Sequence, residues 1–407
     1  MDDSDKYICA FRGRRDYYQV PVALAEGDLL DEFITDAYAG PVLRSLAGMA
    51  PKRLQEKIRA RCEPNLPENR VKCEWKSAVF EHLKNRLGVS PSLTFAKIDR
   101  QFALAVEARA RQRKSNLLVY SHYAWEPFTA RYGHTPKKVL FQFHPHAETE
   151  RRILLDDCIT HPIARQSFEE EVGERVSGDL KRRGMDSWKH ADLILCASSF
   201  TRRSLLEAGA EPGRCKVVPY GIDVMESERA LAASDRFTAI FVGTGCQRKG
   251  LHHVLLAWQK AALPSGSGLI LVCRSIDATL ARLAQATQNV RLIRGVGVEQ
   301  LKELFAISSL FVMPSLVEGF GQVYLEALAS GCPVLGTSNS GLPDLCNGAD
   351  PVWQIEPGNI DELVSTLESL SRTLPGVLDI RQRAQACASR HCWSHFRAGI
   401  RFALESG

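Results

Sequence analysis

Two carboxylates and two glycines gather in the stretch Leu310–Asp344, at a spacing that could hold a phosphorylated ligand. The turn Glu318-Gly319-Phe320-Gly321 follows a short apolar run and precedes a helix-like segment that contains Glu326. The first amides of a helix lack internal acceptors, and a glycine lets a ligand approach the backbone. The turn therefore suits a phosphate or pyrophosphate, with a carboxylate on either side.

Glu326 lies in Gln322–Ser330, whose other residues are apolar nearly all round the expected helix. A glutamate in mid-helix is most often a solvated surface residue, and that interpretation stays open. The apolar neighbours favour burial instead, and a buried carboxylate needs hydrogen-bond partners. The hydroxyl groups of a ribose would provide them.

A second turn, Phe241–Gly250, carries the adjacent cations Arg248 and Lys249 after Gly243 and Gly245. It lacks the third glycine of the dinucleotide fingerprint, and it contains no Walker-type Gly-Lys-Ser/Thr. A guanidinium fork beside an ammonium group can neutralise a diphosphate without a metal ion. A solvated surface pair is the alternative, but the acidic glycine turn later in the same part of the chain favours ligand binding.

A histidine and a glycine follow apolar runs in the first part of the chain. His144 comes after Val139–Phe143, and Gly13 lies in the turn after Tyr7–Phe11. Parallel α/β sheets bind ligands at the carboxyl ends of their strands, so both residues are candidates for a site. A packed histidine and a plain glycine turn are the alternatives.

Alternating strand-like and helix-like segments predict the elements that position these residues. They form two series, which indicates an α/β protein with two doubly wound, Rossmann-like domains. The proline- and glycine-containing stretch after Val218 predicts the boundary, so that residues 1–218 form one domain and 219–390 the other. Residues 391–407 are expected to form a terminal helix that docks on apolar surface.

Three further segments are expected to be helical. They are Gln19–Phe33 after the first glycine turn, the long charged stretch Glu148–Trp188, and the basic segment Pro51–Cys62. In the basic segment, Leu54 and Ile58 recur at helical spacing. This segment could lie on an anionic membrane surface, or it could be a solvated helix face.

The composition is that of a globular protein. With 407 residues, 45% hydrophobic and 24% charged, the chain is long enough for two ordinary domains. A formal net charge of +5 permits an anionic substrate and does not imply nucleic acid. Neither a signal peptide nor an apolar run long enough to span a membrane is recognisable, so a cytoplasmic location is expected.

The 12 cysteines are scattered through apolar segments and include no C-x-x-C pair. We interpret them as buried thiols of a reducing compartment. From this cysteine pattern no zinc site is expected.

The two turns resemble motifs of the retaining glycosyltransferases of family 4. Glu318–Glu326 matches their E-x7-E motif in the form EGFGxxxLEALASGxPV, and Phe241–Gly250 is similar to their FVG…RKG turn. Val218–Asp223 resembles VPNG(I/V)D, and Leu292–Ser315 resembles a G-x(5)-L…PS segment. The resemblance extends over Ala191–Trp393 and is weak before it.

This resemblance implies a GT-B architecture, in which two Rossmann-like domains face each other across a cleft and the last helix returns to the first domain. It implies a nucleoside diphosphate sugar as donor, transfer with retention to a glycan, lipid-linked glycan or small-molecule hydroxyl, and neither metal nor cofactor. The arginine that often follows the first glycine of the RKG turn is Thr244 here. Phosphate binding would therefore depend on Arg248 and Lys249.

The resemblance also implies residue roles. Glu326 would bind the ribose and Glu318 the donor sugar, Arg248 and Lys249 would stabilise the leaving diphosphate, and His144 would contact the sugar near the reacting carbon. The expected catalytic residues are His144, Arg248, Lys249 and Glu318. The expected donor-binding residues are Gly13, Gly243, Arg248, Lys249, Gly295, Val296, Glu318, Gly319, Phe320, Gly321, Gln322 and Glu326.

Two other classes of protein remain as alternatives. A catalytically silent scaffold that binds nucleotide sugars could share the fold, although the complete set of charged residues argues against it. A Rossmann oxidoreductase is disfavoured by the incomplete glycine fingerprint. The expected partners are the donor, a glycan or lipid-linked acceptor and a membrane surface touched peripherally. The nucleobase, sugar, linkage and oligomeric state have no readable pattern.

Overall fold

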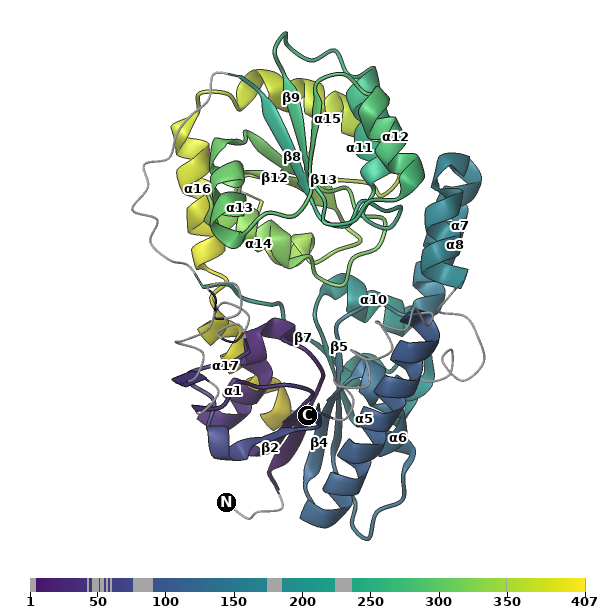
Figure 1. Ribbon diagram of the computed structural model, residues 1–407, viewed down its shortest axis with the longest axis vertical. Helices are drawn as coiled ribbons and strands as arrows, with labels where there is room; N and C mark the ends of the chain where they lie inside the picture. Colours follow the sequence, from purple (N-terminus) through teal and green to yellow (C-terminus); the bar gives the residue numbers. More distant parts are fainter. Residues whose placement is uncertain are drawn as a thin grey trace.

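Two parallel β-sheets, one above the other in the view of Figure 1, form the framework of the protein. The structure is a computed structural model that describes residues 5–41, 44–45, 51, 55, 58, 61–75, 91–173, 185–223, 236–348 and 350–406. Helices connect the strands of each sheet, as the sequence predicts for a doubly wound α/β protein.

The first sheet has seven strands in the order β3-β2-β1-β4-β5-β6-β7, and all its neighbouring strands are parallel. The strand order reverses between β1 and β4, where α/β sheets bind ligands. Its strands are β1 (Tyr7–Ala10), β2 (Leu30–Thr35), β3 (Val71–Cys73), β4 (Asn116–Tyr120), β5 (Lys138–Gln142), β6 (Leu193–Cys196) and β7 (Cys215–Val217).

The second sheet has six strands in the order β10-β9-β8-β11-β12-β13, again all parallel. Its order reverses between β8 and β11, the two strands that the cationic turn and the acidic glycine turn follow. Its strands are β8 (Thr238–Val242), β9 (Gly268–Val272), β10 (Val290–Ile293), β11 (Leu310–Val312), β12 (Val334–Thr337) and β13 (Val352–Ile355).

Helices that follow the strands complete each part of the fold. In the first part they are α1 (Gln19–Glu26), α5 (Pro91–Arg113), α6 (Trp125–Thr129), α7 (Ala147–Thr160), α8 (Arg165–Gly173) and α10 (Ser199–Glu207). In the second part they are α11 (Leu251–Lys260), α12 (Ala278–Ala286), α13 (Val298–Ile307), α14 (Gln322–Ala329), α15 (Ile360–Thr373) and α16 (Leu378–Ser389).

Helix α17 (Trp393–Glu405) lies against α1 of the first part. Arg397 donates to the side-chain oxygen of Gln19 at 2.6 Å, and both Arg397 and Arg401 form ion pairs with Glu26. The neighbouring face of α17 is apolar and buried, with Phe396 and Ile400 in the core.

One predicted helix is wrong in its extent, and another predicted helical stretch is divided. Gln19–Phe33 is helical only to Glu26, because the chain turns at Asp28 (φ 52°) and all six residues of β2 are buried between β1 and β3. The stretch Glu148–Trp188 is helical over most of its described residues, as predicted, but it is divided. Helix α7 ends at Thr160, and a short turn with Pro162 at its start separates it from α8.

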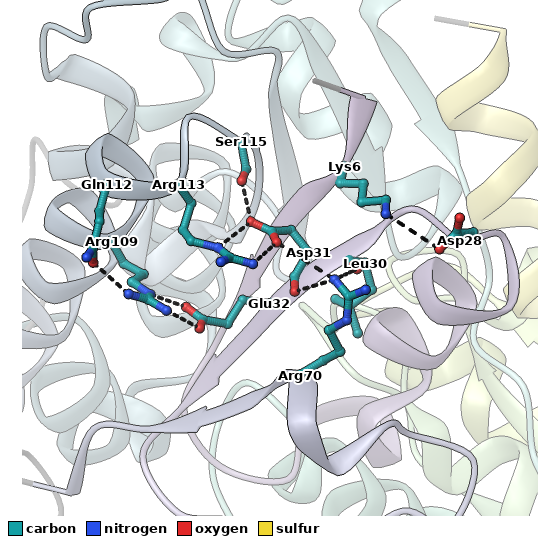
Figure 2. A network of polar contacts seen from close by, with 10 residues as sticks. All are labelled: Lys6, Asp28, Leu30, Asp31, Glu32, Arg70, Arg109, Gln112, Arg113 and Ser115. Atoms are coloured by element: carbon teal, nitrogen blue, oxygen red, sulfur yellow. Dashed lines mark hydrogen bonds and ion pairs between the residues drawn. The ribbon is translucent and has the colours of Figure 1, made fainter. Parts of the chain in front are cut away.

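Arginines of α5 neutralise the two acidic residues of β2 (Figure 2). Arg109 forms two hydrogen bonds to the carboxylate of Glu32, at 2.6 and 2.7 Å. Arg113 donates Nε–H to Asp31 at 3.0 Å, and Ser115 also donates to that carboxylate. These bonds hold β2 against α5, and they explain why an acidic sequence forms a buried strand.

The basic segment Pro51–Cys62 lies mostly outside the described residues, so its contact with a membrane stays a prediction. Among the helices that the structure describes, none has the length and apolar character needed to cross a membrane. All 12 cysteines are free thiols and eight of them are buried, which agrees with the interpretation of buried thiols.

Arg109→Ala is expected to lower the free energy of unfolding by about 2 to 3 kcal/mol, because it leaves the Glu32 carboxylate buried without its partner. The matched control is Arg111→Ala on the same helix, whose i,i+4 pair with Glu107 is exposed and should be worth about 0.5 kcal/mol or less. Urea unfolding measures both changes. Equal losses in the two variants would contradict a stabilising role of the Arg109–Glu32 pair.

Candidate active site

The predicted cations and the predicted glutamate meet at the carboxyl ends of β8 and β11. Arg248 Nη1 donates to the carbonyl oxygen of Val317 at 3.1 Å and to Glu318 Oε2 at 3.3 Å, and Lys249 Nζ binds the same carboxylate oxygen. The Glu318 side chain is 9% exposed and each cation is 14% exposed. Two turns that are 69 residues apart in the sequence thus form one buried charged cluster.

The charge of this cluster suits an anionic ligand. Burial alone would raise the pKa of Glu318, but the neighbouring charges of Lys249 and Arg248 lower it to about 2. Glu318 is therefore ionised at neutral pH, and it offsets one of the two positive charges. The remaining positive charge, held in a place with little water, favours an anion such as a diphosphate.

Gly250 holds the cationic turn close to the end of β11. It adopts a left-handed conformation (φ 70°) at the start of α11, and a Cβ there would lie 2.1 Å from the carbonyl oxygen of Pro314. In the same place the amide of Leu316 donates to the carbonyl oxygen of Arg248 at 2.9 Å. Only glycine fits this contact. The backbone contact therefore fixes the position from which the side chains of Arg248 and Lys249 extend.

The acidic glycine turn leads into α14 as the sequence predicts. Gly321 precedes the helix in a left-handed conformation (φ 86°), and a Cβ there would lie 2.6 Å from the buried ring of Tyr324. The Tyr324 hydroxyl donates to the carbonyl oxygen of Met313 at 2.8 Å, which ties α14 to the end of β11. The amide of Tyr324 donates to the carbonyl oxygen of Gly321 at 2.9 Å. The amides of Gln322 and Val323, at the first two positions of α14, lie where a helix has no internal acceptor and suit a phosphate.

The glycine turn also touches the first part of the protein. A Cβ on Gly319 would lie 1.9 Å from the carbonyl oxygen of Phe143 and 3.3 Å from the Cα of His144. The carbonyl oxygen of Gly319 accepts hydrogen bonds from Ser198 at 2.5 Å and from Thr201 at 3.2 Å. The loop after β11 is thus packed directly on the loop after β5 and on the start of α10.

His144 is thereby placed beside Glu318, as the predicted site requires. Its charge is one of the influences that lower the pKa of Glu318, after burial and the two cations. The half-buried ring of His144 packs 4.7 Å from the ring of Phe143, and its carbonyl oxygen accepts from Gln142 at 2.7 Å.

Glu326 is half-buried on α14 and less enclosed than its apolar neighbours predicted. Burial raises the pKa of its carboxyl group. Among the described residues no hydrogen bond or ion pair reaches this carboxylate, although its charge acts on Tyr17 and, after burial, raises the pKa of that phenol. Glu326 therefore faces the turn after β1 with its carboxylate available to a ligand.

The turn after β1 begins at Gly13, which has φ 80° and donates its amide to Asp36 at 2.8 Å. Next come three residues, Asp16, Tyr17 and Tyr18, in the left-handed region with φ between 40° and 64°. Such a run is strained in residues other than glycine, and strain of this kind is typical of functional loops. Asp16 compensates by accepting from the buried hydroxyl of Tyr120 at 2.7 Å.

Arg15 is a site residue that the sequence reasoning missed. Its guanidinium lies 4.2 Å from the centre of the Phe143 ring, next to His144, and its side chain is largely enclosed. The run Arg12-Gly13-Arg14-Arg15 directly after a strand was the available signal. A basic run is usually a solvated face, so it gave no reason to choose Arg15.

Two predicted donor-binding residues of the glycine turn contribute in different ways. The side chain of Phe320 is 2% exposed and packs edge-to-face on Tyr220 at 5.2 Å, so only its backbone can meet a ligand. Gln322 donates its side-chain amide to the carbonyl oxygen of Gly221 at 2.7 Å, which links α14 to the segment that connects the two sheets.

Gly243, Gly295 and Val296 complete the predicted donor-binding set. Gly243 follows β8 directly, and its amide donates to Val272 of the neighbouring strand at 3.1 Å. Gly295 and Val296 follow β10, the edge strand two places from β8, and Gly295 is exposed. Like the charged cluster, they follow the carboxyl ends of the strands, but they lie two strands away from β8.

A shallow cavity between Pro333, Leu374 and Ile380 lies at the opposite end of the second sheet, where β11 and β12 begin. Its charged residue, Arg381, already donates to the carbonyl oxygens of Gly331, Ala306 and Ser308. This cavity is therefore not a candidate for the chemistry of the site.

Residues 225–385 match the family model described as glycosyl transferases group 1. The chain is 28% identical over 223 residues to a GDP-mannose-dependent monoacylated alpha-(1-6)-phosphatidylinositol monomannoside mannosyltransferase of Corynebacterium glutamicum, covering 49% of this chain and 56% of that protein. It is 48% identical over 80 residues to a D-inositol 3-phosphate glycosyltransferase of Streptomyces scabiei, covering 20% and 18%. The chain spans about half or less of the length of these curated relatives.

Solved structures share the whole architecture. Anabaena Alr3699/HepE in complex with UDP superposes with a TM-score of 0.59 at 17% identity, covering 99% of this chain and 100% of that one. WaaG, a glycosyltransferase involved in lipopolysaccharide biosynthesis, gives 0.57 at 17% identity, covering 97% and 98%. These likenesses show the fold, which is the GT-B fold that the sequence predicted. Together with the family match, they support a glycosyltransferase.

Glu318→Gln is expected to destabilise the protein, because it leaves two buried cations without their counter-charge. The pKa of Glu318 falls from an ordinary 4.5 to about 2 in the folded state, which corresponds to about 3 kcal/mol of stability. This stability is complete above pH 4.5 and is lost as the pH falls towards 2. The wild type should therefore exceed the variant by a constant amount from pH 7 to about pH 5, and by less below that.

Unfolding by urea between pH 2 and pH 7 measures this difference. The matched control is Glu299→Gln on α13, whose exposed pair with Lys302 should show little effect at any pH. A difference for Glu318→Gln that persists unchanged to pH 2 would contradict a stabilising charge on this carboxylate.

Proposed function

We propose that this protein is a retaining glycosyltransferase of family 4 that moves a sugar from a nucleoside diphosphate sugar to a hydroxyl acceptor without a metal ion. The observation that carries the proposal is the buried cluster of Arg248, Lys249 and Glu318 at the point where the strand order of the second sheet reverses. The match of residues 225–385 to the glycosyl transferases group 1 supports it.

The two cations suit the leaving diphosphate. As the bond between the sugar and the diphosphate breaks, negative charge grows on the phosphate oxygens, and groups already fixed in place stabilise that charge best. Arg248 is fixed by Val317 and Glu318, and Lys249 is fixed by the same carboxylate. They supply the positive charge for which other enzymes use a divalent cation, so the proposed chemistry has no need of one.

The two glutamates have different parts in the proposal. Glu318 has a pKa of about 2, so at neutral pH it can accept a hydrogen bond from a sugar hydroxyl but cannot act as a general acid. Glu326 is half-buried without a partner among the described residues, and a pair of ribose hydroxyls would satisfy it. The amides at the start of α14 would bind a phosphate between them.

The acceptor side belongs to the first sheet. His144 follows β5 and faces the glycine turn, while Gly13 and Arg15 belong to the strained turn after β1. We assign His144 to the sugar near the reacting carbon and the turn after β1 to the acceptor and donor together. The acceptor remains a hydroxyl group of a glycan, a lipid-linked glycan or a small molecule.

The nucleobase is left open because the relatives differ. The Corynebacterium protein is described as dependent on GDP-mannose, and HepE was solved with UDP and with UDP-glucose. Binding of UDP, GDP and ADP should therefore be compared.

One of the three nucleoside diphosphates is expected to raise the melting temperature in the presence of EDTA. At a concentration of 100 times Kd, binding adds about 2.7 kcal/mol to stability. Glu326→Ala should weaken this binding about tenfold, since it removes one charged hydrogen-bonding partner. Glu299→Ala, an exposed helix glutamate of the same sheet, is the control. No shift with any nucleotide would contradict the donor site.

Turnover tests the diphosphate role of the two cations. Arg248→Ala combined with Lys249→Ala should slow hydrolysis of the preferred nucleotide sugar by about a thousandfold or more, because it removes the groups that stabilise the leaving charge. Lys260→Ala, at the exposed end of α11, serves as control. Wild-type rates in the double variant would refute this role. Nucleotide binding without turnover of any donor would favour the silent scaffold.

A further inference from the structure

Three histidines and an aspartate converge between the end of α7 and the start of α11. Asp157 and His161 are one helical turn apart at the end of α7, in the first part of the protein. His252 and His253 lie in the first turn of α11, in the second part. The four side chains thus join the two parts, and none of them belongs to the proposed catalytic set.

The ligand atoms of these side chains are close together. Nε2 of His253 lies 2.7 Å from Asp157 Oδ1, Nε2 of His252 lies 3.0 Å from Oδ2, and Nδ1 of His161 lies 3.1 Å from Oδ1. One ligand atom from each of the four residues lies within 4.8 Å of every other. A tetrahedral metal ion at 2.0–2.1 Å from its ligands separates them by about 3.4 Å. This value lies between the 2.7 Å of the shortest distance given above and the 4.8 Å limit for all four atoms.

The surroundings are enclosed. The side chains of His252, His253 and Asp157 are between 0% and 4% exposed, and that of His161 is 18% exposed. Gln247 donates to Asp157 Oδ2 at 2.7 Å and to the carbonyl oxygen of Leu154 at 2.8 Å, so it orients the carboxylate from outside. A partner that orients a ligand in this way is typical of metal sites.

The position of the two adjacent histidines is unusual. Consecutive residues of a helix point about 100° apart, so His252 and His253 would not ordinarily face the same atom group. Here both rings, 3.9 Å apart between centres, direct Nε2 at one carboxylate. Burying three imidazoles around one carboxylate is costly, and a common positive ion bound by all four offsets that cost.

We propose that Asp157, His161, His252 and His253 bind a divalent transition-metal ion, with zinc as the best fit. Imidazole nitrogens and one carboxylate oxygen are ligands that zinc prefers, and four protein ligands make a closed, structural site. The ion would fasten α7 to α11 directly after Lys249, and so would hold the two sheets at one distance. This inference does not depend on the proposed glycosyltransferase activity.

The sequence contains signals for this site that the cysteine pattern did not reveal. They are the Asp-x3-His spacing at the end of one charged helix and the His-His pair just after the RKG turn. The expectation that there is no zinc site was based on the cysteine pattern, whereas the proposed ligands include no cysteine.

Metal content and spectroscopy test the proposal on the full chain without a polyhistidine tag. Purified protein should retain close to one equivalent of zinc after dialysis, and the EDTA-treated protein should recover it in competition with a chromophoric chelator. Cobalt(II) bound in its place should show the intense visible bands of tetrahedral coordination. A sulfur-to-cobalt charge-transfer band would assign the ion to cysteines and overturn the proposal, as would failure to bind either metal.

Two variants locate the ion. His161→Gln, at the least buried of the four positions, should fold and should weaken zinc binding by more than about tenfold, because loss of even the partners that orient metal ligands costs about 10- to 100-fold. His395→Gln, an exposed histidine on α17, should bind zinc like the wild type. Equal affinity of His161→Gln and the wild type would place the ion elsewhere and overturn the proposal. Nucleotide binding, measured separately by thermal shift, reports on the donor site alone.

Discussion

The contact between Gly319 and the backbone of Phe143 determines how the two sheets meet. At this point the chain has no room for a side chain, and Ser198 and Thr201 hold the Gly319 carbonyl from the side of the first sheet. This contact brings the candidate site together. Glu318 directly precedes Gly319, and His144 directly follows Phe143, whose carbonyl oxygen Gly319 touches. Displacement of this contact would separate Glu318 from His144, which lie on different sheets.

Charged side chains from both sheets surround the contact between Gly319 and Phe143. The two cations of the turn after β8 pair with Glu318, His144 lies close enough to lower the pKa of that carboxyl group, and Arg15 packs on the ring of Phe143. Because each charged group is held by the protein itself, little reorganisation is needed when a charged ligand enters. Glu326 differs from the others, since its carboxylate has no partner among the described residues and its ionised form is disfavoured by burial.

Local patterns were sufficient for most strands and for both turns, since apolar runs and glycines act over a few residues. They failed where a distant partner changes the meaning of a residue. Leu30–Phe33, the first residues of β2, were predicted as the end of a helix. The arginines that neutralise Asp31 and Glu32 there are 82 and 77 residues away. The strained turn at Asp16–Tyr18 has no sequence signature, because other residues than glycine rarely adopt left-handed angles. The sequence predicts that the turns of Lys249 and Glu318 bind one ligand, but it does not predict the ion pair between them.

The packing of α17 on α1 has a consequence for biosynthesis. Arg401 pairs with Glu26, which is made 375 residues earlier. At the usual rate of translation this corresponds to about 20 to 75 s, during which α1 lacks the helix that covers it. The first sheet therefore cannot reach its final form as soon as its own strands have left the ribosome. Until α17 has been made, the surface of α1 that it covers in the folded protein stays open to solvent.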